Sequence, residues 1–207
     1  MKTIGILGGL GPESTVAYYH YITRKYYELR GDYAYPEILI QSFNFKEFID
    51  AGYQCPAKIT SAIEALSRAG ADFVIAACNS VHIAYEEVAN HISIPWVSIM
   101  EAVAERIQEG QITKVALLGT VFTMRNDFYP NVLSKFNIET VVPKEIAQNA
   151  INEIIYDELV RGIVTKESRR VVSDSIEELQ RDGIEGVILG CTELPFLIKP
   201  GDIRLPL

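Results

Sequence analysis

The sequence contains one motif twice: a short apolar run that ends in small residues, then a cysteine, then two polar residues. The first copy is FVIAACNS at residues 73–80, and the second is GVILGCTE at residues 186–193. A glycine-containing stretch precedes each copy, and an apolar run after such a turn is typical of a buried strand in a parallel sheet. We therefore expect Cys78 and Cys191 at the carboxyl ends of two buried strands, where open α/β sheets place their ligand sites.

A second pair of similar strands supports a duplication. The run IGILG at residues 4–8 resembles KVALLGT at residues 114–120, so that Gly8 aligns with Gly119. Both pairs occur in the same order and at almost equal spacing. Chance resemblance is the alternative, but the agreement of both spacings favours two duplicated α/β halves. We predict domains at 1–110 and 111–207, with the extreme C-terminus packing onto the first half.

The expected fold class is α/β, with two pseudo-duplicated domains, each a parallel-rich sheet flanked by helices, and the active site in the cleft between them. Helices are predicted at 12–29, 56–69, 81–89, 100–109, 124–136, 148–161 and 166–181. Strands are predicted at 4–8, 37–42, 73–77, 96–98, 114–120, 139–142 and 186–190.

Composition excludes several classes of protein. The net charge of −8 over 207 residues, without a Lys/Arg block, argues against nucleic acid as a partner. No apolar run approaches the ~20 residues that a membrane-spanning helix requires. The three cysteines are an odd number and do not suit a secreted disulfide framework. No signal peptide is recognised at the N-terminus. We expect a cytoplasmic protein with free thiols.

The two strand-end cysteines have a chemical and a structural interpretation. A buried cysteine is often only a small apolar side chain. A thiol at a strand-to-helix turn, however, is close to a helix N-terminus, which lowers its pKa and favours the thiolate. The same turns offer backbone N–H groups to a carboxylate. Because both copies have this form, we favour the chemical interpretation for Cys78 and Cys191. Cys55 precedes Pro56, has no counterpart and is interpreted as incidental.

The glycine-rich turn at residues 8–14, GGLGPES, matches a dinucleotide fingerprint weakly. Ser14 replaces the third glycine of the fingerprint, and Pro12 removes a backbone donor that a phosphate site would use. A tight turn that lets the backbone approach a small anion explains the glycines equally well.

Other polar side chains leave alternatives open. The histidines have no metal-ligand spacing, and no C-x-x-C is present, so no metal site is predicted. His82 could face the site or serve in packing. Thr120 and Thr123 follow the second glycine turn and could cap a helix or donate to a ligand. The tyrosines of the first long helix are expected in packing or in a subunit contact.

Several segments together resemble the aspartate/glutamate racemase family. The resemblance extends over nearly the whole chain. The combination of the paired cysteine motifs with the GGLGP turn is the feature that is specific to this family. The matching segments are 4–15, 77–82, 119–120, 123–124, 155–159 and 190–195.

The resemblance implies a two-domain α/β homodimer that racemises an amino acid without pyridoxal phosphate or another cofactor. It implies that one of Cys78 and Cys191, as thiolate, removes the α-proton, and that the other, as thiol, returns a proton to the opposite face. Asn79, Ser80, Thr120 and Thr192 match positions that hold the α-carboxylate, and Glu193 matches one near the amino group. The full set of expected substrate-binding residues is Gly9, Leu10, Asn79, Ser80, Thr120, Thr123, Thr192, Glu193, Lys46 and Lys166, where the two lysines are candidates for the side-chain carboxylate.

Aspartate is the first expected substrate and glutamate the next. Related cysteine enzymes that decarboxylate arylmalonates, isomerise maleate or racemise hydantoins remain alternatives. A non-catalytic binder of an acidic metabolite is another, whereas a redox role would need a reversible disulfide. Chains of this family usually continue beyond residue 207 with a further strand and helix, so we expect either an incomplete chain or a shortened end.

Overall fold

Each of two units is built on a three-stranded parallel sheet. The computed structural model describes residues 1–207, and the units are Met1–Ile99 and Met100–Leu207. The sequence placed the boundary after Gly110, so α5 (Ile99–Glu109) was assigned to the first half but falls almost entirely in the second unit. The domain limits 1–110 and 111–207 stay a prediction.

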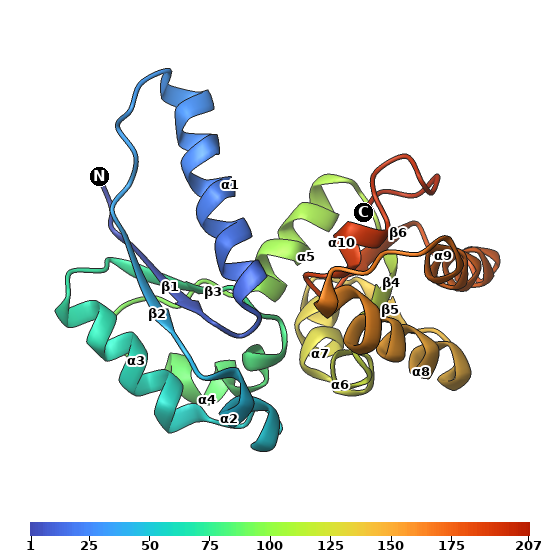
Figure 1. Ribbon diagram of the computed structural model, residues 1–207, viewed down its shortest axis with the longest axis horizontal. Coiled ribbons are helices and arrows are strands. Elements are labelled where there is room, and N and C mark those ends of the chain that lie inside the picture. The colour runs from blue at the N-terminus through green and yellow to red at the C-terminus, as the bar shows by residue number, and fades with distance from the viewer. The chain divides into compact units, whose positions relative to one another are not determined.

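The first sheet has the strand order β2–β1–β3. Its strands are β1 (Ile4–Gly8), β2 (Ile38–Ser42) and β3 (Phe73–Ala76), and β1 is buried along its whole length because it is the central strand. The helix α1 (Pro12–Arg30) lies on one face of the sheet, and α3 (Pro56–Arg68) and α4 (Tyr85–Ala89) lie on the other (Figure 1). Ile59, Ile63 and Leu66 share one side of α3 and are buried, as their helical spacing predicts.

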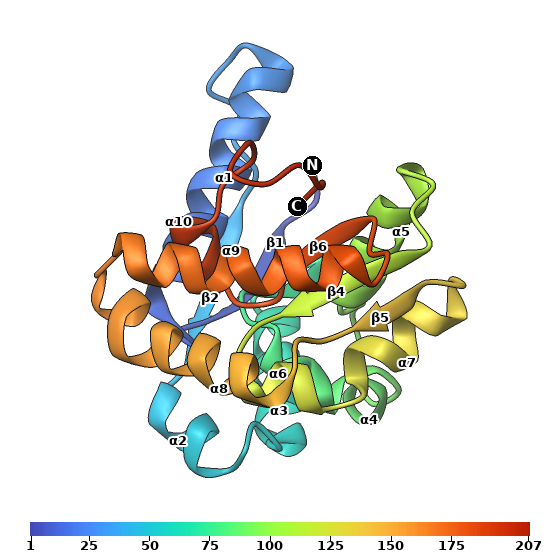
Figure 2. The same ribbon diagram turned by 90° about the vertical axis from the view of Figure 1, so that its right-hand side faces the viewer.

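The second sheet repeats this order as β5–β4–β6. Its strands are β4 (Lys114–Leu118), β5 (Glu139–Val141) and β6 (Gly186–Leu189), all parallel. The helices α8 (Glu145–Glu153) and α9 (Lys166–Arg181) run side by side (Figure 2) and pack with β4, β6 and α10 (Leu194–Leu197) in one apolar core. The equal strand order of the two sheets confirms the predicted α/β fold class with two similar halves.

None of the helices is both long and apolar enough to cross a bilayer. Shorter elements complete the chain. These elements are α2 (Phe45–Asp50), a 3-10 turn (Ser80–Ala84), α6 (Val121–Arg125), α7 (Phe128–Lys135), a π-helical turn (Ile154–Glu158) and a 3-10 turn (Leu159–Arg161).

Four predicted elements differ from the structure. The predicted helix 81–89 begins as a 3-10 turn before α4, and the predicted helix 148–161 continues after α8 as a π-helical and a 3-10 turn. The predicted strand 96–98 is a single bridge between Val74 and Trp96, because α5 begins at Ile99 and ends the extended segment. The predicted helix 124–136 is two helices, α6 and α7, with Asn126 in an extended conformation between them. The Asn126 side chain donates to the carbonyl of Phe122, which competes with the helical hydrogen-bond pattern.

The end of the chain pairs with the second sheet. The backbone N–H of Val187 in β6 donates to the carbonyl of Pro206 at 2.9 Å, and Ile203 and Leu205 pack against the core of the second unit. This segment therefore lies along β6, whose open edge offers it a backbone donor. The expected packing of the extreme C-terminus onto the first half stays a prediction.

Gly9 cannot be replaced without strain. It has a φ of +77°, and a Cβ at this position would lie 2.5 Å from Ser42 Oγ and 2.6 Å from the carbonyl oxygen of Phe43. Phe43 itself donates its N–H to the carbonyl of Gly8 at 2.9 Å, so the β1 turn and the end of β2 are joined by backbone. The glycine lets these two strand ends approach each other.

We expect Gly9→Ala to lower the free energy of unfolding by about 3 kcal/mol or more, since it adds a backbone clash to an unfavourable φ. Gly31→Ala is the matched control, because Gly31 also has a positive φ, +69°, but has no atom within 4 Å of the added Cβ. That change should cost about 1 kcal/mol. Urea unfolding followed by circular dichroism measures both, and equal losses would contradict the close-approach argument.

Candidate active site

In the first unit, five predicted site residues gather at the carboxyl edge of the sheet. Cys78 is the second residue after β3, and the N–H of Ala77 donates to the carbonyl of Leu7 at 3.0 Å, which ties this turn to the end of β1. The five residues are all buried in the unit: Gly9, Leu10, Cys78, Asn79 and Ser80. The carboxyl-edge position that the sequence predicted for Cys78 is the observed one.

His82 lies directly behind the cysteine turn. Its Nδ1 is 3.0 Å from the carbonyl oxygen of Cys78, and its Nε2 accepts from the backbone N–H of Ile99 at 3.2 Å. The side chain is 2% exposed, and its burial lowers the pKa to about 4 against the weaker opposing effect of the carbonyls of Cys78 and Asn79. Of the two interpretations left open by the sequence, the structure favours packing, with a direct bond to the cysteine backbone.

Tyr18 is one of the tyrosines expected in packing, and its position near Cys78 was not predicted. It lies on α1 and packs on the cluster that includes Ala77, next to Cys78. Burial raises the pKa of its phenol, and the negative charge of a Cys78 thiolate raises it further. Its hydroxyl therefore stays protonated beside the thiol. The helical spacing of Tyr18 and Ile22 predicts that both face the sheet, but nothing in the sequence indicates which strand end they reach.

In the second unit, Cys191 occupies the equivalent position as the second residue after β6. Its thiol donates to Glu193 Oε2 at 2.9 Å, and the hydroxyl of Thr192 donates to the same oxygen at 2.9 Å. All three side chains are half-buried. One carboxylate thus organises the whole turn, a contact that spacing alone did not predict, since the sequence analysis placed Glu193 near a substrate amino group.

The threonines after β4 serve as a helix cap. Thr120 is the N-cap residue of α6, and its Oγ1 accepts from the N–H of Thr123 at 3.3 Å. The two hydroxyls are 3.2 Å apart, and Thr123 is 1% exposed. The capping interpretation is confirmed for Thr120, and a role in substrate binding stays a prediction for both. The Gly190 N–H donates to the Leu118 carbonyl at 2.6 Å, so this cap lies beside the Cys191 turn.

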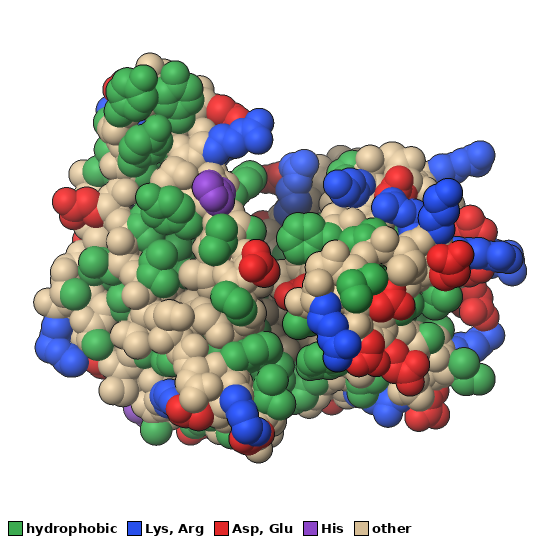
Figure 3. Space-filling model, in the orientation of Figure 1, with side chains coloured by type: hydrophobic (Ala, Val, Ile, Leu, Met, Phe, Trp, Pro, Cys, Tyr) green, Lys and Arg blue, Asp and Glu red, His purple; other side chains and the backbone are tan.

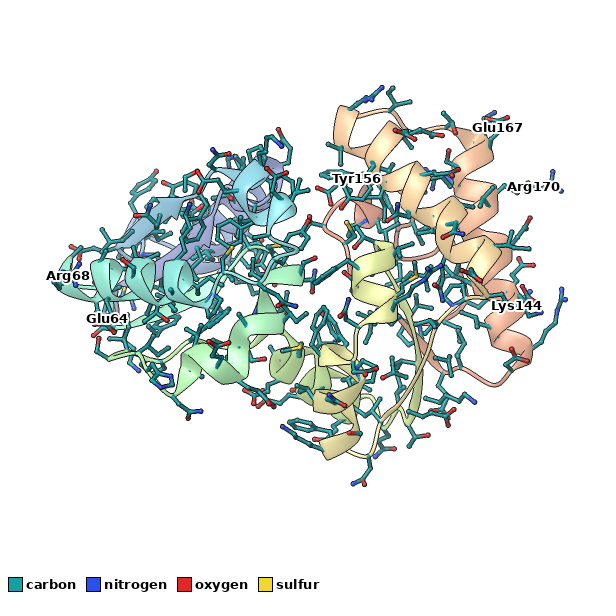
Figure 4. All side chains as sticks on the ribbon, turned by 90° about the horizontal axis from the view of Figure 1, so that it is seen from below. Glu64, Arg68, Lys144, Tyr156, Glu167 and Arg170 are labelled. Atoms are coloured by element: carbon teal, nitrogen blue, oxygen red, sulfur yellow. The ribbon has the colours of Figure 1, made fainter.

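The two candidate lysines are both exposed. Lys46 lies on α2, and its ammonium pairs with Asp50 at 2.9 Å. Lys166 is the first residue of α9, and its neighbours Glu167 and Arg170 lie on the outer side of that helix (Figure 4). Thr165 caps α9 and donates its hydroxyl to Glu158 at 3.3 Å, which anchors this helix end. Contact of either lysine with a substrate stays a prediction.

The other candidates of the sequence lie apart from the strand ends. Cys55 is at the N-cap position of α3, and all three cysteines are outside disulfides. His91 bonds to the carbonyl of Glu87, and His20 is exposed on α1. No group of three or more His, Cys, Asp or Glu side chains is arranged to hold a metal ion.

Comparison with known proteins gives a consistent assignment. The chain is 33% identical over 159 residues to the broad-specificity amino-acid racemase RacX of Bacillus subtilis. The aligned region covers 73% of this chain and 69% of that protein. It spans 46% of the length of several glutamate racemases that it also matches.

Two solved structures align with 100% of this chain, and the alignment covers 92% of each of their own chains. The crystal structure of a proposed Asp/Glu racemase from Yersinia pestis has a TM-score of 0.93 at 32% identity. That of an aspartate racemase homologue from Pyrococcus horikoshii has a TM-score of 0.86 at 41% identity. The family model described as Asp/Glu/hydantoin racemase matches residues 7–204. The chain therefore belongs to the Asp/Glu/hydantoin racemase family, a family of isomerases.

Proposed function

We propose that the protein racemises an acidic amino acid, aspartate first and glutamate next, by proton transfer between Cys78 and Cys191 without a cofactor. One observation carries the proposal. Each cysteine is the second residue after the third strand of its sheet, and the two sheets have the same strand order. Duplicated halves of this kind can supply one thiol to each face of a substrate carbon.

The chemistry requires two bases of this kind. One thiolate removes the α-proton, the carbanion is stabilised at the α-carboxylate by hydrogen-bond donors, and the opposite thiol delivers its proton to the other face. The α-carbon is inverted, the first cysteine now carries the proton removed from the substrate, and the opposite cysteine is left as the thiolate. For the other enantiomer the roles are reversed. The donors proposed for the carboxylate are Asn79, Ser80, Thr120 and Thr192, which follow strand ends in each unit.

The partners of the two thiols differ, and this supports unequal resting states. The Cys191 thiol donates to the Glu193 carboxylate, so a thiolate at this position would face a like charge. Cys78 is followed by Asn79 and Ser80 and lies beside the protonated phenol of Tyr18. We infer that the resting protein holds Cys191 as the acid and Cys78 as the base.

A second candidate is a racemase of broad specificity, favoured by the identity to RacX and by the pairing of Lys46 with Asp50. Proton NMR in D₂O separates the two. Loss of the α-proton signal and appearance of D-aspartate, with little exchange of neutral amino acids, supports the acidic specificity. Equal exchange of neutral amino acids supports the broad one. No exchange with any amino acid would favour a decarboxylase, an isomerase of another substrate or a binding protein.

The proposed homodimer and cytoplasmic location rest mainly on the family resemblance. Exposed apolar side chains gather along α1 and the loop after it (Figure 3), which supports self-association. They are Val16, Tyr19, Tyr21, Tyr27, Leu29, Tyr33 and Tyr35.

We expect Cys78→Ser and Cys191→Ser each to reduce racemisation by about 1000-fold or more, because one of the two proton transfers loses its base. Each variant should retain α-proton exchange from one enantiomer only, and the retained enantiomer should differ between them. Cys55→Ser is the control, since Cys55 lies at the start of α3, and it should keep full activity. Racemisation at the full rate by either of the first two variants would reject the two-base mechanism.

Replacing Glu193 should change the reactivity of one cysteine. In Glu193→Gln the like charge beside Cys191 is removed, so alkylation of Cys191 should reach its half-maximal rate at a pH lower by about 1–2 units. Cys78 should be unaffected, as read by mass spectrometry of the two peptides. Glu177→Gln makes the same charge change at an exposed site of α9 and should alter neither cysteine. An unchanged Cys191 profile in Glu193→Gln would contradict the assignment of Cys191 as the resting acid.

The lysines are tested by a substrate comparison. If Lys166 or Lys46 binds the side-chain carboxylate, its replacement by Met should raise the KM for aspartate by about 10-fold to 100-fold, the strength of a charged hydrogen bond. Activity on a neutral amino acid should not change. Lys144→Met, on another exposed lysine of the second unit (Figure 4), is the control. Equal effects on acidic and neutral substrates would exclude this role.

A further inference from the structure

The hydrogen bonds of His82 define both its charge and its tautomer. The backbone N–H of Ile99 can only donate, so Nε2 must carry a lone pair. The carbonyl of Cys78 can only accept, so Nδ1 must carry the proton. The only form that satisfies both neighbours is the neutral imidazole protonated at Nδ1.

The two bonds join two parts of the chain that matter for the proposed reaction. The first holds the backbone of Cys78 itself, at the turn after β3. The second holds Ile99, the last residue of the first unit and the first residue of α5, through which the chain continues into the second unit. One imidazole thus links the cysteine turn to the segment that leaves the unit.

The ring is held on its sides as well as at its nitrogens. Its centroid is 5.0 Å from that of Trp96 and 6.2 Å from that of Tyr85, whose hydroxyl donates to the Trp96 carbonyl at 3.1 Å. The segment that carries Trp96 is bound to β3, because Val74 donates to Pro95 and Val97 donates to Val74. Movement of the imidazole would therefore disturb several packed groups at once.

This arrangement argues against His82 as the base that ionises Cys78. Both ring nitrogens are engaged by backbone groups, so neither can take the thiol proton without losing a bond. Burial also keeps the ring neutral, since it lowers the pKa to about 4, and a thiolate–imidazolium pair would need the charged ring.

We propose that His82 is a positioning residue for the proposed racemisation: as the neutral Nδ1–H tautomer, it fixes the Cys78 turn and ties it to the start of α5. The inference rests on the proposed function for its kinetic consequence, but its geometric part can be tested without any substrate.

Three variants separate the two hydrogen bonds. His82→Asn places an amide donor near the position of Nδ1 and can keep the bond to Cys78. His82→Gln places an amide oxygen near the position of Nε2 and can keep the bond from Ile99. His82→Phe keeps the ring and loses both bonds.

We expect His82→Phe to lower kcat about 100-fold, the effect of misplacing a reacting group by about 1 Å, with KM changed less than about twofold. His82→Asn should recover most of this loss, and His82→Gln should recover little, because only the former holds the Cys78 carbonyl. Equal kcat in the wild type and in folded His82→Phe would overturn the proposal, as would losses that follow only the thermal stability of the three variants.

Alkylation of the cysteines gives a readout that does not depend on racemisation. Cys78 is 8% exposed, so releasing its turn in His82→Phe should speed its alkylation about 10-fold. Cys55 in the same unit and Cys191 in the other should be unchanged and serve as internal controls. If the wild type shows no racemisation but Cys78 still responds in this way, the positioning holds and the proposed function fails. An unaltered Cys78, or equal acceleration of all three cysteines, would overturn the positioning role.

The tautomer is read by long-range ¹H–¹⁵N NMR on the three histidines, with His82→Phe for assignment. His82 should show a protonated Nδ1 and a bare Nε2 at neutral pH. A protonated Nε2, or titration near the unperturbed value of 6.5, would reject the assignment.

The same group predicts a pH dependence of stability. In the unfolded chain the His82 ring takes up a proton below about pH 6.5, whereas the folded ring, packed against Tyr85 and Trp96 and bonded to backbone groups, stays neutral down to about pH 4. The contribution of His82 is therefore complete above pH 6.5 and is lost as the pH falls to about 4. The unfolding midpoint of the wild type should fall over this range more steeply than that of His82→Phe, and parallel curves would contradict the buried neutral ring.

Discussion

The parallel pairing of three strands is the constraint on which each half of the protein depends. Because β1, β2 and β3 run in the same direction, their carboxyl ends lie at one edge, and the same holds for β4, β5 and β6. The glycines after the central strands let the neighbouring strand ends approach closely at that edge. Residues that follow different strands, far apart in the sequence, therefore lie at the same sheet edge as one cysteine in each unit.

The sequence could predict the parts of this arrangement that depend on local pattern. An apolar run followed by Cys78 or Cys191 indicates a strand end, and the helical spacing of Ile59 and Ile63 indicates the buried side of α3. The break at Asn126 had a local signal that was overlooked, because Pro130 lacks the N–H that a continuous helix would donate to the carbonyl of Asn126. The side-chain hydrogen bond from Asn126 to the carbonyl of Phe122 accompanies the break. The strand predicted at 96–98 is wrong because the extended segment ends where α5 begins, and the strand propensity of these residues does not indicate that boundary.

The partners of the thiols could not be predicted, for a different physical reason. Tyr18 lies near Cys78 because α1 packs on the sheet beside Ala77, and His82 meets Ile99 through the fold of the intervening segment. Even Glu193, two residues from Cys191, was assigned to a substrate, because spacing does not say whether a carboxylate turns back to its own loop. Spacing fixes which residues follow a strand, whereas rotamers and tertiary packing decide which atoms meet.

The duplication makes the positions of the two cysteines equivalent, but their surroundings are not. The Cys191 thiol donates to a carboxylate at a half-buried turn. Cys78 is buried, its backbone carbonyl lies 3.0 Å from Nδ1 of the neutral His82 ring, and the phenol of Tyr18 is within electrostatic range of its thiol. The proposed two-base racemisation, which runs in both directions, needs one thiol and one thiolate at any moment, not two of either. The equal backbone positions can supply the geometry for both directions, and the unequal neighbours can decide which thiol holds the proton before a substrate binds.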